Sequence, residues 1–538
     1  MRRSTLPVVL AATALTALTG CLAGPAGPVT TRVPVAPIAG PPPGPSAPGP
    51  SPHGQTPPPP PPRAAAPDTA RGAAVRAENA RPGTPKWRIP PGRAAAPGLE
   101  GYAGAVSVLP GTPVPLYLRG TGEVRVTALR TGWYGGIGAR AVWTGRMRAT
   151  AQPAPVVDDA PVTGAGGLRG ARTVLARWRA SGTVPTAGWP EGHYLLRLDG
   201  DRASRQIPLT VRSGTAAGRV LVVAATMTWQ AYNSWGGRSL YRGPAGPAGP
   251  AGGDTRTRSL AVDYDRPYDR GAGAGDYPVT DAPLVRQAER AGLPLAWATD
   301  LDLAERPELM DGATAVAFGG HAEYLTARTA RHLDRALDGG TNLAVFGANT
   351  AYWRVRVAGR RVVSTRRAAL DPLSRTDPDG TTVRFADTPG SFPEQRLLGV
   401  RTECFPARAQ WVVSDPTWFG FRGTGVRAGT SLGRIVGVEF DAVPPDAPAT
   451  GGAAGIATRV VARSPVTCRG RRTAHTAVWV GRPSGAGVFS AATLDWTCAL
   501  EDACRDVSVR AREVELLGRV TRTVLTAMAA GPAARSGA

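Results

Sequence analysis

The chain has 538 residues and a formal net charge of +23 at pH 7, from 63 lysines and arginines against 40 aspartates and glutamates. A basic excess of this size can indicate a nucleic-acid partner. Here the positive residues are arginines apart from Lys86, and they are scattered without a basic stripe that carries aromatic residues. The scattered arrangement of the arginines therefore argues against nucleic-acid binding. The remaining interpretation of the charge is attraction to anionic polymers of a cell envelope.

Residues 1–20 have the parts of a signal peptide. A basic start at Arg2 and Arg3 precedes an apolar segment, residues 6–18, and small residues lead to Cys21. The apolar segment is shorter than the roughly 20 residues that a membrane-spanning helix needs. Residues 18–21 resemble the bacterial lipobox, which implies cleavage before Cys21 and a lipid on its sulfur. The alternative is ordinary secretion. We expect an extracytoplasmic protein anchored to the cell membrane through Cys21.

Four more cysteines are candidates for disulfide bonds: Cys404, Cys468, Cys498 and Cys504. An even number of cysteines in an exported chain favours disulfides. Cys498 and Cys504 are close enough in sequence to close a small loop, and Cys404 with Cys468 is the complement, although three connectivities are compatible with the sequence. A zinc site is disfavoured because no C-x-x-C pair is present.

Two compositional segments precede the main body of the chain. Residues 21–98 are rich in proline, alanine and glycine, with six prolines at residues 57–62, and are expected to form an extended, disordered tether. Residues 99–213 contain short apolar runs separated by glycine and proline, which predicts a small β-sandwich. Within it, the aromatic residues of 130–136 suggest either packing against a neighbouring domain, which we favour, or a sugar-stacking surface.

The pattern changes in residues 218–530. Short apolar runs at residues 220–225, 295–298, 313–318 and 342–346 predict buried strands, and predicted helices lie between them. Strands that alternate with helices are typical of an α/β domain with a doubly wound, mostly parallel sheet. That fold class is our prediction.

Four polar or aromatic motifs lie in this domain, and three of them follow predicted strands. They are Thr228-Trp-Gln-Ala-Tyr-Asn-Ser-Trp-Gly-Gly237, Asp263-Tyr-Asp-Arg-Pro-Tyr268, Gly319-Gly-His-Ala-Glu-Tyr324 and Gly347-Ala-Asn-Thr-Ala-Tyr-Trp-Arg354. Ligands of open α/β sheets bind beyond the carboxyl ends of the strands. We therefore expect these motifs to converge on one crevice.

Together the motifs resemble the C-terminal domain of the large (beta) subunit of N,N-dimethylformamidase and its bacterial relatives, over residues 218–529. The sandwich resembles the domain that accompanies it. The resemblance implies a class I glutamine amidotransferase-like fold and an amidohydrolase with one iron ion, held by two tyrosines and a glutamate. Carried over by motif, the ligands are Tyr232, Tyr264 and Glu323, and the catalytic residue is His321. Phenolate and carboxylate oxygens are hard donors suited to a ferric ion.

Structural roles are the alternative for each of these residues. Buried tyrosines are common core residues with a hydrogen-bonded hydroxyl, a glutamate is favoured in the first turn of a helix, and His321 can cap that helix. The loop after residues 342–346 contains no cysteine, and no G-x-S-x-G motif is present, which argues against covalent catalysis by a thiolate or serine.

Several other residues are weaker candidates for the site. Asp300 and Asp302 follow a predicted strand and either line the crevice or cap a turn. Glu439 is a carboxylate within a predicted strand that either pairs with an arginine or joins the site. His475 and the Trp353-Arg354 pair are expected to have structural roles.

The leading hypothesis is an iron-dependent hydrolase of C–N amide bonds at the cell envelope, acting on a small-molecule amide or an envelope polymer. The alternative is a non-catalytic lipoprotein that binds envelope glycan or peptide. The sequence determines neither the substrate nor the oligomeric state.

Overall fold

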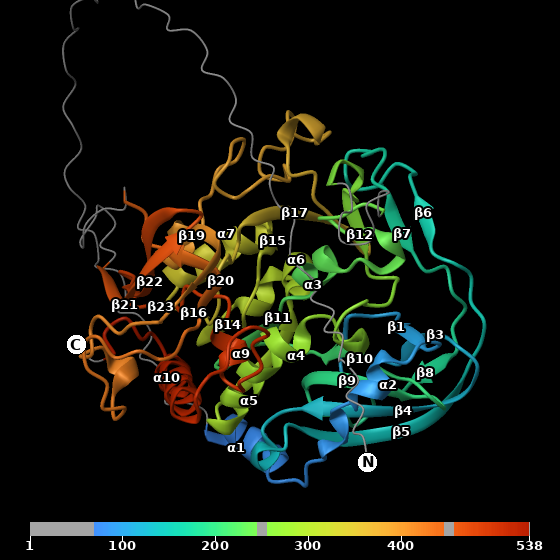
Figure 1. Ribbon diagram of the computed structural model, residues 1–538, viewed down its shortest axis with the longest axis horizontal. Helices are drawn as coiled ribbons and strands as arrows, with labels where there is room; N and C mark the ends of the chain where they lie inside the picture. Colours follow the sequence, from blue (N-terminus) through green and yellow to red (C-terminus); the bar gives the residue numbers. More distant parts are fainter. Residues whose placement is uncertain (1–68, 245–254, 446–456, 537–538) are drawn as a thin grey trace, which may run out of the picture.

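The computed structural model describes residues 69–244, 255–445 and 457–536 (Figure 1). Cys21, the signal peptide and most of the proposed tether lie outside these residues. The end of that segment is folded, because α1 (Thr69–Asn79) and α2 (Pro91–Ala95) lie within residues 69–98. No helix of the described ranges is long and apolar enough to cross a membrane.

Two facing sheets contain residues 100–211. The first has three antiparallel strands, β1 (Glu100–Ala103), β3 (Val114–Arg119) and β8 (Gly182–Val184). The second has five strands in the order β2 (Ser107–Val108), β10 (Ser204–Val211), β9 (Gly192–Asp199), β4 (Gly122–Thr131) and β5 (Ala139–Ala149). Buried and less buried residues alternate along β3, and a shared apolar core joins the two sheets.

The aromatic residues of 130–136 pack the β-sandwich against its neighbours. Tyr134 is buried, and its hydroxyl donates to Glu78 of α1. The Arg290 guanidinium lies 4.6 Å from the ring centroid of Trp133. These contacts favour the packing interpretation of this motif over an exposed sugar-stacking surface.

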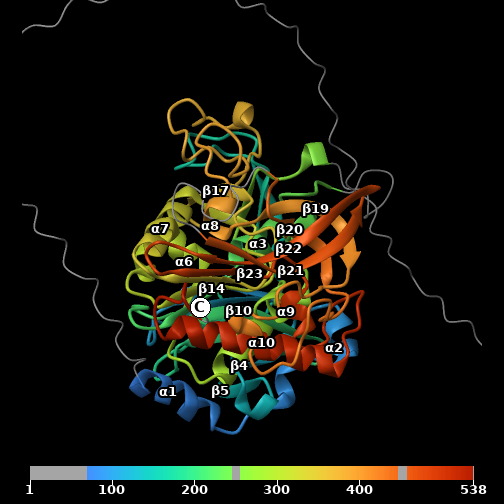
Figure 2. The same ribbon diagram turned by 90° about the vertical axis from the view of Figure 1, so that its left-hand side faces the viewer.

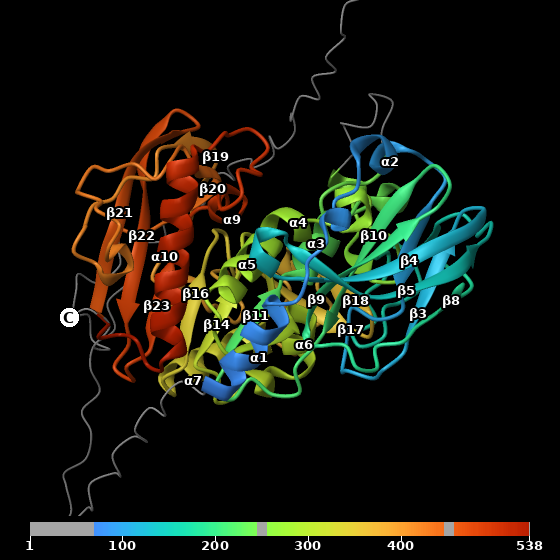
Figure 3. The same cartoon turned by 90° about the horizontal axis from the view of Figure 1, so that it is seen from below.

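A seven-stranded sheet forms the centre of the second half of the chain. Its strand order is β13 (Leu295–Thr299), β11 (Val220–Ala224), β14 (Ala315–Phe318), β16 (Asn342–Val345), β23 (Gly487–Ser490), β22 (Arg471–Gly481) and β21 (Ala457–Cys468). The first five strands are parallel, and β22 and β21 are antiparallel to their neighbours. In Figures 1 and 3 the β21–β22 hairpin and the β-sandwich lie at opposite ends of the molecule.

Helices pack on both faces of this sheet. One apolar core contains residues of α5 (Ala282–Arg290) and α10 (Ala511–Ala529), and Figure 2 shows the long α10 in red. The core on the other face contains residues of α6 (Asp300–Glu305), α7 (Ala327–Asp338) and α8 (Gln395–Leu398). In α7, Leu333 and Leu337 are buried while Arg331 and Arg335 are more exposed, as expected for an amphipathic helix.

The prediction of a doubly wound, mostly parallel α/β domain is wrong. Strands make up 32% of the structure and helices 23%, and the strands form several mixed sheets. Beside the central sheet are a four-stranded sheet, β12 (Ala261–Asp263), β18 (Arg361–Val363), β17 (Trp353–Ala358) and β15 (Tyr324–Thr326), and two strand pairs, β19 (Arg401–Ala409) with β20 (Val436–Ala442) and β6 (Val156–Asp158) with β7 (Thr173–Leu175). A short apolar run predicts a buried strand without specifying its partner or direction, which explains the error.

Candidate active site

The motif after β14 turns sharply at the end of the strand. A Cβ atom on Gly319 would lie 2.3 Å from the carbonyl oxygen of Thr280, a distance that real side chains do not reach. Only glycine fits this close approach of two backbones. The turn carries His321 and Glu323 beyond the carboxyl end of β14, where ligands of parallel sheets bind.

Glu323 is a buried carboxylate surrounded by tyrosines, with only 2% of its surface exposed. Its Oε1 accepts a 2.6 Å hydrogen bond from the Tyr241 hydroxyl, which in turn accepts a 2.8 Å bond from Tyr324. Tyr232, the last residue of α3 (Thr226–Tyr232), stacks on Tyr241 with ring centroids 4.3 Å apart. Three phenols from separate parts of the chain therefore gather beside one carboxylate.

The phenols and the carboxylate of this cluster are acidic groups that are buried with little positive charge beside them. Burial raises the pKa of Tyr232 and of Tyr241 well above the ordinary value, and Glu323 raises both further. Burial also raises the pKa of Glu323, while His321 lowers it. The Glu323 Oε2 atom is buried and has no hydrogen-bond partner. A buried acceptor without a hydrogen bond is costly, and His321 Nε2 lies 3.4 Å from this oxygen.

Arg366 places a positive charge beside the tyrosines of the cluster. Its guanidinium lies 4.0 Å from the ring centroid of Tyr241 and 4.7 Å from that of Trp353, and Nη2 donates a 2.6 Å hydrogen bond to the Tyr324 hydroxyl. Its φ of 62° is in the left-handed region that non-glycine residues rarely adopt. Such strained conformations cluster at functional sites.

His321 lies between two carboxylates. Its Nε2 is 3.4 Å from Glu323 Oε2 and 3.2 Å from Glu439 Oε2. Burial acts to lower the pKa of His321, but Glu439 and Glu323 outweigh burial and raise it to about 9. His321 and Glu439 keep 12% and 14% of their side-chain surface exposed, so solvent reaches the pair.

Asn349 holds Glu439 beside the histidine. Its Nδ2 donates a 2.7 Å hydrogen bond to Glu439 Oε2, and its Oδ1 accepts a 2.8 Å bond from Thr402 in β19. The loop after β16 is strained, with a φ of 54° at Asn349. Glu439 lies in β20, so the site draws on the ends of β14 and β16 and on the β19–β20 pair.

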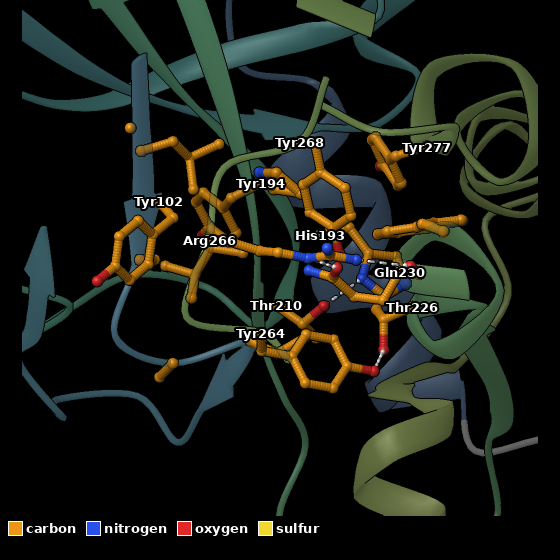
Figure 4. Close-up of a pocket in the computed structure, with 18 residues that line it drawn as sticks. Tyr102, His193, Tyr194, Thr210, Thr226, Gln230, Tyr264, Arg266, Tyr268 and Tyr277 are labelled. Atoms are coloured by element: carbon orange, nitrogen blue, oxygen red, sulfur yellow. Dashed lines mark hydrogen bonds between the residues drawn. The ribbon is translucent and has the colours of Figure 1, made fainter. Parts of the chain in front are cut away.

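Tyr264 shares an apolar core with Tyr324, Tyr232 and Tyr241, but its hydroxyl contacts other groups, as Figure 4 shows. Its hydroxyl is 3.0 Å from Thr226 Oγ1, which donates to Asp300 Oδ1 at 2.6 Å. Tyr264 lines a cavity of about 30 Å³ that His193 of the β-sandwich also lines, a volume that accommodates roughly one or two water molecules. The structure therefore does not bring Tyr264 to Glu323; Tyr241 occupies that place.

Tyr241 carries no signal of the kind that marked the other candidates. Those residues belong to the four motifs, most of which follow predicted strands, whereas Tyr241 lies in a loop after α3 and outside the motifs. Asn349 and Glu439 were visible in the sequence, as a motif residue and as a carboxylate within a predicted strand. Their joint role depends on contacts between residues 90 positions apart.

A protein-family model described as N,N-dimethylformamidase beta subunit-like, C-terminal, matches residues 125–506. This is more than half of the chain, and it includes every residue of the tyrosine and histidine cluster. The chain belongs to this family. The resemblance found in the sequence motifs is thereby confirmed, and the family name indicates a dimethylformamidase-like amidohydrolase. No curated protein matches the chain.

The expected disulfide bonds are present in this dimethylformamidase-like protein. They join Cys404 to Cys468 and Cys498 to Cys504. The first ties β19, which carries Thr402 of the site, to the end of β21. Sulfur atoms that are bonded to each other are not available as metal ligands.

Of the weaker candidates, Glu439 joins the site, and Asp300, Asp302, His475 and Arg354 have structural contacts. Asp302 forms a capping box with Thr299 at the start of α6, and the carboxylate of Asp300 accepts from the backbone nitrogen of Met227. His475 is buried and lies 3.0 Å from a backbone carbonyl through Nε2. Arg354 is buried and donates to the carbonyls of a neighbouring loop.

Proposed function

We propose that this protein is a metal-dependent amidohydrolase in which Tyr232, Tyr241 and Glu323 hold an iron ion. The observation that carries the proposal is the buried Glu323 carboxylate, whose Oε2 has no hydrogen-bond partner and whose Oε1 is bonded to Tyr241. Phenol and carboxylate oxygens are hard donors, and their three negative charges on deprotonation suit a ferric ion. Tyr241 replaces Tyr264 as the second tyrosine because Tyr264 contacts Thr226 instead.

A bound metal ion would supply Lewis-acid chemistry, which polarises an amide carbonyl and lowers the pKa of a water molecule. The protein's own residues supply proton transfer. Nε2 of His321 lies between Glu323 and Glu439, which favour its protonated form, so it is placed to deliver a proton to the departing amine nitrogen and then to take up the proton that the attacking water releases. Asn349 fixes the Glu439 carboxylate and thereby the orientation of the imidazole.

Metal analysis of purified variants tests the ligand set. Wild type and Tyr264→Phe are expected to contain one iron per chain, whereas Glu323→Ala and Tyr241→Phe lose most of it. Tyr264→Phe is a matched control because it removes one hydroxyl from a buried tyrosine outside the cluster. Iron that survives Tyr241→Phe and disappears in Tyr264→Phe would overturn the assignment.

Amine release from a panel of small formamides and acetamides tests the activity. His321→Ala is expected to retain iron while its rate falls about 10²- to 10⁴-fold, the usual loss for a general acid–base. Full activity of Glu323→Ala would exclude hydrolysis at this cluster.

We also propose an extracytoplasmic location with a lipid anchor at Cys21. The lipobox-like residues 18–21 support it, as do the two disulfides, since disulfides persist in oxidising compartments. Fractionation tests the anchor: wild type is expected with the membranes, and Cys21→Ala in the supernatant or as uncleaved precursor.

A further inference from the structure

A basic groove lies on the outer side of α10, far along the chain from the tyrosine cluster. Its volume is about 480 Å³. Figure 3 shows α10 at the surface beside β16 and β23. The groove is lined by side chains of α10, of the segment around Phe419–Phe421 and of the C-terminal tail: Phe419, Arg422, Arg519, Arg522, Thr523, Thr526, Ala527 and Ser536.

Two of the three arginines of the groove have no carboxylate partner among the described residues, and the third, Arg522, shares one. Arg422 and Arg519 form no ion pair with any residue of the described ranges, and Arg519 donates only to a neutral acceptor, the carbonyl of Gly423 at 2.8 Å. Arg522 keeps 18% of its side chain exposed and lies 3.3 Å from Glu515. That glutamate also lies 3.8 Å from Arg290, so one carboxylate serves two arginines.

The cluster therefore holds an uncompensated positive charge. Burial lowers the pKa of Arg522, and the charge of Arg290 lowers it further. Both partial desolvation and repulsion from Arg290 therefore disfavour the charged guanidinium. Arg522 also donates to the neutral Gln287 Oε1 at 2.5 Å, which fixes its position without adding negative charge. A bound anion would relieve the repulsion between these arginines.

We propose that this groove binds a phosphate-bearing ligand. Guanidinium groups recognise phosphate oxygens by paired, charge-assisted hydrogen bonds. A phosphate group offers more acceptor oxygens than a carboxylate, enough for several arginines together with the hydroxyls of Thr523, Thr526 and Ser536. The residues of the groove are separate from the proposed iron ligands, so this site does not depend on the hydrolase activity.

Calorimetric titration of the full chain with two probes tests the site and separates two sources of phosphate. Pyrophosphate represents a small free phosphate compound, and a linear poly(glycerol phosphate) represents a polymer. We expect the double variant Arg422→Ala/Arg519→Ala to bind at least about tenfold more weakly, from the loss of two charge-assisted contacts. Binding should also weaken between about 20 mM and about 200 mM salt because screening grows.

The control is Arg125→Ala/Arg148→Ala, which removes two exposed arginines from the β-sandwich. It should bind as wild type does, and both double variants should retain the wild-type melting temperature. The single variant Arg422→Gln provides the same contrast if the double variant does not fold. If poly(glycerol phosphate) binds more tightly than pyrophosphate, the ligand of the groove is a polymer. If the two probes bind comparably, the ligand is a small phosphate compound. Absence of binding, or equal losses in the groove variant and the control, would overturn the site.

Discussion

Replacing Glu289 by glutamine removes the counter-charge of an arginine that joins the β-sandwich to α5. Arg130 Nη2 lies 2.5 Å from Glu289 Oε1, and the two side chains are 3% and 0% exposed. Arg130 also donates to the Tyr134 hydroxyl and to the carbonyl of Glu191, both at 3.0 Å. The substitution keeps the shape of the side chain and removes its negative charge.

The expected cost follows from the burial of this pair. A guanidinium that stays buried without its counter-charge destabilises a fold by about 3–5 kcal/mol. Glu123→Gln is the matched control, because Glu123 pairs with Arg146 while both side chains are at least 60% exposed. Pairs exposed to this degree contribute about 0–1 kcal/mol.

Urea unfolding gives the measurement, followed by tryptophan fluorescence and by far-UV circular dichroism. The free energy of unfolding comes from linear extrapolation, and the two probes show whether the sandwich unfolds separately. The double variant Arg130→Met/Glu289→Leu should recover most of the loss, because apolar replacement of a buried pair is often nearly neutral.

The reasoning would be refuted if Glu289→Gln cost no more than Glu123→Gln. That result would mean that water or another group reaches Arg130 in solution. A double variant less stable than Glu289→Gln would show that the hydrogen bonds of Arg130 matter more than its charge.

Two further predictions concern the disulfides and pH. The Cys404–Cys468 bond spans 64 residues and the Cys498–Cys504 bond spans 6, so double serine variants should lose about 4 and about 2 kcal/mol of unfolding free energy, respectively; the reverse order of melting temperatures would contradict the loop-entropy argument. Burial lowers the pKa of His475 to about 4, below the value of about 6.5 in the unfolded chain. The stability that the buried neutral imidazole contributes above pH 6.5 is therefore lost as the pH falls towards 4. Between pH 7 and pH 5 the His475→Gln variant should therefore lose about 2 kcal/mol less than wild type in urea unfolding, and identical pH profiles would contradict this.

Much of the site could be predicted from the sequence because the patterns that indicate it are local. The apolar run before Gly319 predicts a strand, and the polar residues that follow it must lie at the strand's end. His321 and Glu323 were found in this way, and Tyr232 follows the first strand of the same sheet. The resemblance implies Tyr264 as the second tyrosine ligand, whereas the hydroxyl bonded to Glu323 is that of Tyr241, because distance along the chain does not reveal which loop folds back onto the carboxylate.

Local patterns in the sequence predict four of the seven strands of the central sheet, the family to which the chain belongs and which four cysteines form disulfides, without fixing their pairing. They depend on residues near one another in the chain, where periodicity and motif spacing carry the information. The mixed sheets, the contact of Tyr241 with Glu323 and the placing of Glu439 beside His321 were decided only by the tertiary structure. Strand pairing and loop packing are long-range, and their free energy depends on which surfaces become buried together.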